Sequence, residues 1–298
     1  MIQNYKDYIK EHLDIDPFNE EDWELDNLSP LLQIVRKKYG SKPCDEIIGL
    51  HCSNKELTSL EGIENLINLE RFYCYYNHLT SLEGIENLIN LKELGGSNNQ
   101  LTSLENIEKL VNLKELDCGS NQLTSLEGIE NLVNLKEISC YNNELTLLEE
   151  IENLVNLKKI NCNYNQLTSL EGIENLINLK ELGCSNNQLT SLEGVENLVN
   201  LKELYCDFNQ LTSLEGIKNL VNLEAFSCFR NQLTSLEGLE NLINLKKLYC
   251  DFNQLTSLEG IENLVNLKEL YCNHNRFSEG YKKYLKEYCR NKKIRLYI

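Results

Sequence analysis

A leucine recurs every 22 residues along most of this chain, without insertion or deletion. Ten leucines keep this spacing: Leu57, Leu79, Leu101, Leu123, Leu145, Leu167, Leu189, Leu211, Leu233 and Leu255. Residues 57–276 therefore form ten complete units, and half a unit precedes them. Repeats of this length are typical of chains in which each unit packs on its neighbours, so the repeat decides the fold class.

Each unit contains one segment typical of a strand and one typical of a tight turn. In the segment 201–211 (LKELYCDFNQL), apolar residues alternate around the cysteine, which predicts a short strand with one buried face. In the segment 212–222, apolar residues recur at intervals of three, which predicts a 3₁₀ or short helical turn on the opposite side. Because one unit cannot bury its own apolar stripe, the units must stack. The sequence thus predicts an α/β repeat solenoid.

The strand segment carries the pattern LxxLxCxxNxL and is followed by LEGIENL. This pattern resembles the leucine-rich repeat, with Cys in place of the third apolar residue. The units resemble the 22-residue class of internalins and of a protein-phosphatase regulatory subunit. The resemblance implies a right-handed solenoid with a parallel β-sheet on its concave face and tight turns on its convex face. The near-identical units, rich in Asn, Lys, Ile and Tyr, also resemble repeat proteins of giant DNA viruses, which would place the chain in a host cytoplasm.

Ten of the twelve cysteines occupy one position of the repeat, and Gly96 takes that position in one unit. They are Cys52, Cys74, Cys118, Cys140, Cys162, Cys184, Cys206, Cys228, Cys250 and Cys272. Parallel strands lie about 4.8 Å apart, which is wide for a disulfide with Cβ atoms about 3.8 Å apart. We expect reduced thiols packed in the core, with a metal or redox role as the alternative. Since charges interrupt the N-terminus and no apolar run could span a membrane, we expect a soluble, cytoplasmic protein.

Asparagine and glycine mark two further positions of the repeat. An unbroken asparagine column follows the strands: Asn77, Asn99, Asn121, Asn143, Asn165, Asn187, Asn209, Asn231, Asn253 and Asn275. The resemblance implies that these amides form a hydrogen-bonded ladder inside the turn. Glycine, as at Gly172, opens the tight turn in most units, which predicts a conformation unfavourable to other residues. Asn106 is expected to substitute there, whereas Glu150, together with Leu147, predicts an irregular unit at residues 145–152.

Forty-six acidic residues against twenty-nine basic ones give a net charge of −17. This balance argues against nucleic acid and anionic membranes as partners. One glutamate column runs from Glu61 to Glu259, and a second runs three residues later. A lysine row precedes the strands: Lys92, Lys114, Lys136, Lys158, Lys180, Lys202, Lys246 and Lys268. We interpret the acidic columns as a solvated face that opposes association, with cation or basic-partner binding as the alternative.

A solenoid leaves an apolar cross-section at each end, and different sequence stands there. Residues 1–45 are predicted to form a helical N-terminal cap, 46–276 the solenoid and 277–298 a C-terminal cap. One N-terminal helix is predicted from the spacing of Tyr5, Tyr8, Ile9 and Leu13, and Phe18 and Trp23 are expected to anchor the acidic segment after it. A second helix is predicted from Ser29 as N-cap to Gly40 as terminator. The alternative is that the N-terminal region recruits a second protein.

The C-terminal cap is predicted to combine a helix with a strand. The helix is indicated by amphipathic spacing, and the segment IRLYI then reads as a strand. The residues that define the helix are Tyr281, Tyr284, Leu285 and Tyr288.

The outward residues on either side of the cysteine column vary among otherwise similar units, so recognition could be encoded there. An aromatic cluster with neighbouring polar residues marks the last units: Tyr205, Asp207, Phe229, Tyr249, Asp251, Tyr271 and Asn273. A smaller pair, Tyr73 and Tyr75, lies near the start. Tyrosine is favoured at binding hot spots, but aromatic rings also stabilise sheets by packing across strands. Both interpretations stay open.

The sequence favours a non-enzymatic scaffold that binds a protein partner on the concave face, without cofactor or metal, as a monomer. Its four histidines form no recognisable nucleophile or zinc arrangement, and no phosphate-binding loop is present. The acidic and aromatic candidates predict a partner with a basic or aromatic-compatible surface. The competing function is that of a structural spacer without a specific partner.

Overall fold

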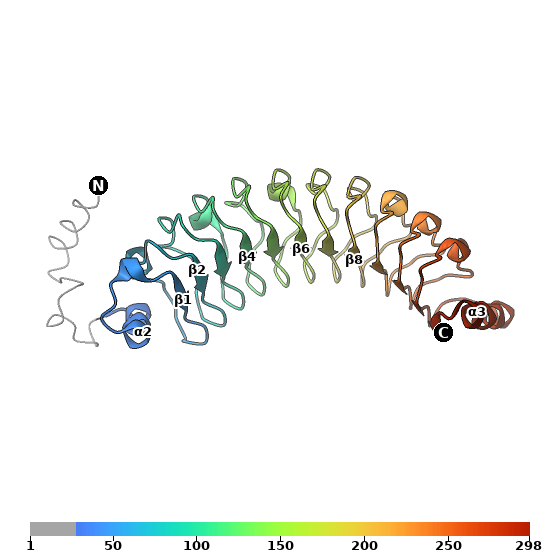
Figure 1. Ribbon diagram of the computed structural model, residues 1–298, viewed down its shortest axis with the longest axis horizontal. Helices are drawn as coiled ribbons and strands as arrows, with labels where there is room; N and C mark the ends of the chain where they lie inside the picture. Colours follow the sequence, from blue (N-terminus) through green and yellow to red (C-terminus); the bar gives the residue numbers. More distant parts are fainter. Residues whose placement is uncertain (1–27) are drawn as a thin grey trace.

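The computed structural model describes residues 28–298, which contain one sheet of twelve parallel strands in chain order. The strands are β1 (Gly49–His51), β2 (Arg71–Tyr73), β3 (Glu93–Gly95), β4 (Glu115–Asp117), β5 (Glu137–Ser139), β6 (Lys159–Asn161), β7 (Glu181–Gly183), β8 (Glu203–Tyr205), β9 (Ala225–Ser227), β10 (Lys247–Tyr249), β11 (Glu269–Tyr271) and β12 (Arg295–Tyr297). The repeats form an arch, with 3₁₀ turns along its outer edge and strands nearer its inner edge (Figure 1). The predicted repeat solenoid is confirmed.

The strand register lines up equivalent residues of successive units and so builds the core. In β8 and β9, Leu204 lies opposite Phe226, and the neighbouring cysteine positions also point inward. The leucines and isoleucines of the turns complete one apolar cluster that runs from unit to unit. Each unit buries its stripe on the next, as the repeat requires.

The asparagine column after the strands forms the expected ladder. Asn187 shows the pattern: its Oδ1 accepts from the Leu167 N–H at 3.0 Å, and its Nδ2 donates to the carbonyls of Cys162 and Cys184 at 3.1 and 3.0 Å. The same three kinds of bond recur at the other members of the column, from Asn77 to Asn275. The amides thus satisfy backbone groups where the chain leaves the sheet.

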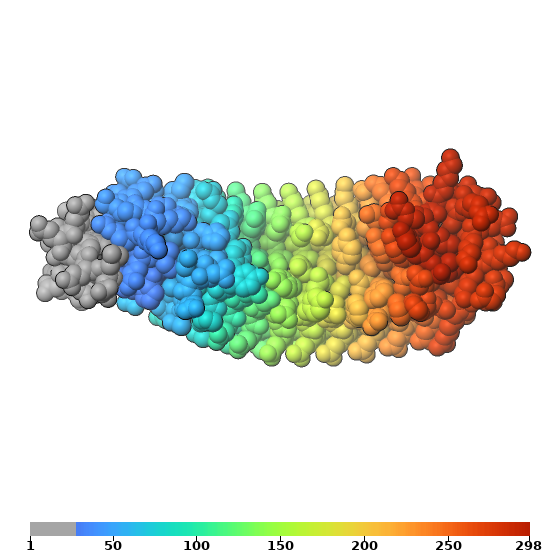
Figure 2. Space-filling view, turned by 90° about the horizontal axis from the view of Figure 1, so that it is seen from below, coloured from blue at the N-terminus to red at the C-terminus, as the bar shows by residue number. Residues whose placement is uncertain are grey.

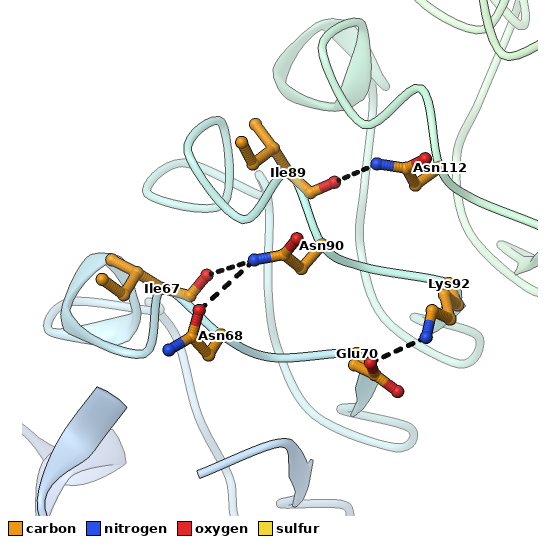
Figure 3. Close-up of polar contacts among 7 residues, drawn as sticks. All are labelled: Ile67, Asn68, Glu70, Ile89, Asn90, Lys92 and Asn112. Carbon is orange, nitrogen blue, oxygen red and sulfur yellow. Dashed lines mark hydrogen bonds and ion pairs between the residues drawn. The ribbon is translucent and has the colours of Figure 1, made fainter. Parts of the chain in front are cut away.

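A second asparagine ladder, which the sequence analysis missed, lies before the strands. Figure 3 shows two of its members: Asn90 donates to the Ile67 carbonyl at 3.4 Å, and Asn112 donates to the Ile89 carbonyl at 2.8 Å. Equivalent bonds continue along the solenoid to Asn266. These amides are exposed, in contrast to the buried ladder, and they join each unit to the one before it.

The glycines that open the tight turns adopt left-handed conformations, as expected. Gly172 has φ +98°, and a Cβ there would lie 2.5 Å from the Leu148 carbonyl oxygen. The residue type is therefore fixed both by the backbone and by the preceding unit.

The two units without this glycine take another path. In both, a 3₁₀ turn, Glu105–Ile107 or Glu149–Ile151, begins two residues earlier in the unit than the 3₁₀ turns of glycine-containing units such as Ile217–Asn219. Neither Asn106 nor Glu150 has a positive φ. The expectation that Asn106 imitates glycine was thus wrong, whereas the irregularity expected around Glu150 is confirmed. One carboxylate oxygen of Glu150 is buried without a hydrogen-bond partner.

Helices cover both ends of the described solenoid. Helix α2 (Pro30–Tyr39) begins at Ser29, whose hydroxyl accepts from the Leu32 N–H, and it buries Leu31 and Val35. A 3₁₀ turn, Cys44–Glu46, leads from α2 into β1. The predicted second helix is confirmed, while the residues chosen for the first helix and the two aromatic anchors lie outside the described residues.

The C-terminal segment combines a helix and a strand, as predicted. Helix α3 (Glu279–Lys292) begins at Ser278 and buries Leu285 and Cys289. Strand β12 then pairs with β11 and extends the sheet by one strand. Seen from the inner side of the arch, residues 28–298 form one continuous surface (Figure 2). Within residues 28–298, no helix has the length and apolar character needed to cross a bilayer.

Candidate functional site

Three columns of side chains point away from the core on the inner side of the sheet, which we call the concave face. They are the first and third residues of each strand and the residue two positions later, for example Glu203, Tyr205 and Asp207. All nine predicted site residues lie in the second and third columns. The structure groups seven of them along β8 to β11 and places Tyr73 and Tyr75 at β2, near the other end.

Three members of the C-terminal group are tyrosines of the second column, and together with Tyr297 we call them the tyrosine row: Tyr205, Tyr249, Tyr271 and Tyr297. The rings of Tyr249 and Tyr271 stack with centroids 4.6 Å apart, and those of Tyr271 and Tyr297 stack at 4.1 Å. Tyr297 was not among the residues predicted from the sequence, because the last strand was assigned to the C-terminal cap alone. Register with β11 places it at the end of the row.

Tyr205 stands apart from the stacked rings, because Ser227 occupies the position between it and Tyr249. Its hydroxyl donates to Glu203 at 2.6 Å. Burial and this hydrogen bond raise the pKa of Tyr205 above its ordinary value. The phenol therefore stays neutral at physiological pH.

The acidic candidates serve mainly to join neighbouring strands. Asp207 accepts from the Phe229 N–H at 2.8 Å and from the Ser227 hydroxyl. Asp251 is only 7% exposed and accepts from the backbone N–H and Nδ2 of Asn273, at 2.8 and 2.9 Å. Burial raises the pKa of the Asp207 carboxyl. These oxygens are engaged within the sheet, so the rings beside them form the more accessible surface.

Tyr73 and Tyr75 stack with centroids 5.8 Å apart. The Tyr75 ring covers Gly95, where a Cβ would lie 2.2 Å from the hydroxyl oxygen. In the same way Tyr141 covers Gly119. These glycines are places where a neighbouring tyrosine lies flat, so part of the variation in the outward columns reflects packing.

An acidic run of the first column adjoins this pair. Glu93, Glu115 and Glu137 are register neighbours on successive strands, and the Tyr73 hydroxyl donates to Glu93. Burial, followed by the like charges on both sides, raises the pKa of Glu115. Burial also raises the pKa of Tyr73 to about 12. A hollow of about 250 Å³ lies over these residues.

A cluster of aromatic rings and one arginine borders the C-terminal part of the concave face, and of its members only Phe229 was predicted from the sequence. The guanidinium of Arg230 lies 4.8 Å from the ring centroid of Phe252, 5.2 Å from that of Phe208 and 5.6 Å from that of Phe229. His274 stacks on Phe252 at 4.1 Å. We call these five residues the phenylalanine edge. Four of them occupy the position just before the asparagine ladder, a variable column that could have revealed them.

The cysteine column lies in the core. Its ten thiols are free and nearly inaccessible, and several approach a carbonyl of the next unit, as Cys206 does to Ser227 at 3.1 Å. Burial raises the pKa of Cys184 to about 12 and that of Cys162 well above its ordinary value. Among the described residues, no group of three or more His, Cys, Asp or Glu side chains could hold a metal ion. The thiols thus pack as small apolar groups, as expected.

The charged columns have separate roles. The first glutamate column is exposed throughout. Members of the second close the glycine turns, as when Glu174 accepts from the Gly172 N–H at 2.9 Å, so this column is more than a solvated surface. Lys92 pairs with Glu70, which occupies the position of the lysine row in its own unit, at 2.7 Å (Figure 3). In residues 28–298, no ion pair joins the lysine row to either glutamate column.

Comparisons with known proteins agree with this architecture. The family model of leucine-rich repeats (two copies) matches residues 89–131, 133–176, 177–219, 199–241, 221–263 and 243–280. No curated protein sequence matches the chain.

Several solved structures share the fold. Internalin C2 of Listeria monocytogenes is 28% identical, with 69% of this chain and 92% of that one covered and a TM-score of 0.63. A Leptospira interrogans leucine-rich repeat protein is 26% identical, with 82% of each chain covered and a TM-score of 0.58. The functional domain of InlJ from Listeria monocytogenes, which includes a cysteine ladder, is 25% identical, with 79% of this chain and 56% of that one covered and a TM-score of 0.63. With its repeated units, single parallel sheet and buried cysteine and asparagine columns, the chain belongs to the leucine-rich repeat family.

Proposed function

We propose that this protein is a non-enzymatic scaffold that binds a protein partner through the C-terminal part of its concave face. Leucine-rich repeat proteins generally mediate protein–protein interactions. The observation that carries the proposal is the tyrosine row, whose rings remain partly exposed on a rigid sheet. Tyrosine offers a large contact area and loses little conformational entropy on binding.

Packing across strands accounts for part of this surface. The stacks of Tyr271 with its two neighbours stabilise β10 to β12. Packing alone does not require the aromatic residues to gather in the last units, because the same column carries Asp117, Ser139 and Asn161 in the middle of an equally regular sheet. This contrast favours a recognition role for the C-terminal group.

The partner is proposed to present aromatic and basic side chains. Aromatic groups would pack on the tyrosine row and the phenylalanine edge. Basic groups would suit the run of Glu93, Glu115 and Glu137 beside Tyr73 and Tyr75, where three like charges are register neighbours. Tyr73 and Tyr75, together with the neighbouring glutamates, are thus proposed to form a second contact area, which is acidic.

The proposal assigns no catalytic step. Burial holds the cysteine thiols in their unreactive protonated form, as the raised pKa of Cys162 shows. All twelve cysteines are unbridged, which supports a site of action in the reducing cytoplasm. The scaffold is proposed to act as a monomer and without a cofactor.

Capture from cell lysate with three immobilised baits tests the proposal. The baits are the wild type, a Tyr249→Ala/Tyr271→Ala variant, and a control with Ser139→Ala/Asn161→Ala in the same column. We expect saturable capture of one protein by the wild type and the control, and a loss of about tenfold with the tyrosine variant.

Equal capture by all three baits would contradict the proposed face and favour recruitment through the N-terminal region. No capture of any protein at micromolar bait would favour the alternative function, that of a structural spacer without a specific partner.

A further inference from the structure

The tyrosine row has one position without a ring. Tyr249, Tyr271 and Tyr297 stack continuously, with interplanar angles of 21° and 6°. The next position carries Ser227, and the following one carries Tyr205. Two strand spacings, about 9.6 Å, therefore separate the backbones that carry Tyr205 and Tyr249. This is about twice the ring spacing within the stack, so one further ring would continue it.

A hollow of about 370 Å³ lies at this position. Strand β9 creates it with two small residues. Ser227 leaves the second column open, and Ala225 stands in the first column, where ten of the twelve strands have a charged residue. Tyr205 and Tyr249 are the aromatic residues lining the hollow.

The charges around the hollow are largely engaged by each other. Glu203 accepts from Tyr205, and Glu224 pairs with Lys246 and lies 3.6 Å from Lys202. Asp207 accepts from Ser227 at the floor. A guest of either charge would meet like charges in the lining: a cationic guest would be repelled by Lys246 and the exposed Lys247, and an anionic guest by three carboxylates. The lining therefore favours an uncharged guest.

We propose that this hollow receives an uncharged aromatic side chain of the protein partner, stacked between Tyr205 and Tyr249 in the position that Ser227 leaves vacant. The inference rests on the proposed function and specifies how the partner is anchored. A planar ring takes up the space between two rings better than a branched aliphatic group does, because offset stacking uses both faces. The remaining rings of the row hold Tyr249 in place from the other side.

Binding of fluoroindole, followed by fluorine NMR on the full chain, tests the inference. Ser227→Tyr supplies the missing ring, and Ser227→Ala is the matched control, which removes the hydroxyl and keeps the hollow. We expect the first variant to weaken binding at least about tenfold and the second to change it less than about twofold. Ala225→Leu fills the hollow from the adjacent column and replaces Ser227→Tyr if that variant does not fold.

Undiminished fluoroindole binding by the filled variants, or the absence of saturable binding to the wild type, would overturn the inference. Equal or tighter binding of benzamidine or cyclohexanemethanol would overturn the preference for an uncharged aromatic ring.

The lysate capture separates the two proposals. If Tyr249→Ala/Tyr271→Ala abolishes capture and Ser227→Tyr leaves it intact, the anchoring role fails and the binding face stands. If fluoroindole binds as expected but the tyrosine variant captures the partner normally, the hollow accepts an aromatic ring, but the proposed binding face and the anchoring of the partner both fail.

Discussion

Replacing one asparagine from each ladder of the same unit compares a buried amide with an exposed one. Asn187 belongs to the buried ladder and Asn178 to the exposed ladder. Asn187→Ala removes the hydrogen-bond acceptor of the Leu167 N–H, whereas the carbonyls of Cys162 and Cys184 each keep a bond from the neighbouring asparagine of the ladder. Asn178→Ala removes one bond of 2.9 Å, to the Val155 carbonyl, in an exposed setting.

The expected costs follow from these partners. A buried N–H left without an acceptor costs about 1–3 kcal/mol, and each of the two lost carbonyl bonds about 0.5–1.5 kcal/mol. We therefore expect Asn187→Ala to lower the free energy of unfolding by about 4 kcal/mol. Asn178→Ala should lower it by about 1 kcal/mol or less, because water replaces the amide.

Urea unfolding of the wild type and both variants, followed by circular dichroism, measures these differences. The slopes of free energy against urea must agree for the comparison to hold, since a solenoid can unfold in parts. Equal costs for the two variants, or a cost below about 1 kcal/mol for Asn187→Ala, would refute the assignment of the buried ladder as the main polar support of the turn.

Three further predictions concern the core and the turns. In the unfolded chain a thiol has its ordinary pKa of 9.0, whereas burial in the fold raises the pKa of Cys52 and Cys184 to about 12. The contribution of these thiols to the free energy of unfolding is therefore complete below pH 9 and falls by about 1.4 kcal/mol per thiol and pH unit as the pH rises toward 12. Equal free energies of unfolding in urea at pH 8 and pH 10 would contradict this prediction. Gly172→Ala should lower the free energy of unfolding by more than about 2 kcal/mol, because the new Cβ meets the Leu148 carbonyl and the backbone has a positive φ. The control Gly280→Ala, in α3, should leave the free energy of unfolding unchanged or raise it, and similar melting temperatures for the two variants would count against the prediction. Amide hydrogen exchange should be faster at residues 145–152 than at 167–174, where glycine restores the regular turn; equal protection would show that the 3₁₀ path costs nothing.

Most of the fold follows from the sequence because a strict period leaves few alternatives. Leu57 to Leu255 fix the unit, and a unit with one apolar stripe has to stack. The same logic places the cysteines inside and the first asparagine column in the turn. The second asparagine ladder has an equally strict period, but its Asn precedes leucine within an apolar segment, where it was read as part of the return path. Its role depends on a carbonyl of the preceding unit, as between Asn178 and Val155.

The candidate surface was harder to predict. The tyrosines were identified because they lie in outward columns that vary among otherwise similar units. The packing of Tyr75 on Gly95 and the engagement of Asp251 by Asn273 depend on which way each side chain turns, and sequence spacing does not specify this. The turn of Asn106 shows the same limit: asparagine tolerates a left-handed conformation, yet a 3₁₀ turn was available and is the one adopted.

Isothermal titration of the captured partner against the wild type and the Tyr249→Ala/Tyr271→Ala variant, with melting curves of both proteins, tests the central claim most directly. If the tyrosine row is a binding surface, the dissociation constant rises at least about tenfold while the melting temperature falls by only a few degrees. An unchanged dissociation constant, or a weakening that merely follows loss of folded protein, would show that these rings serve the sheet alone.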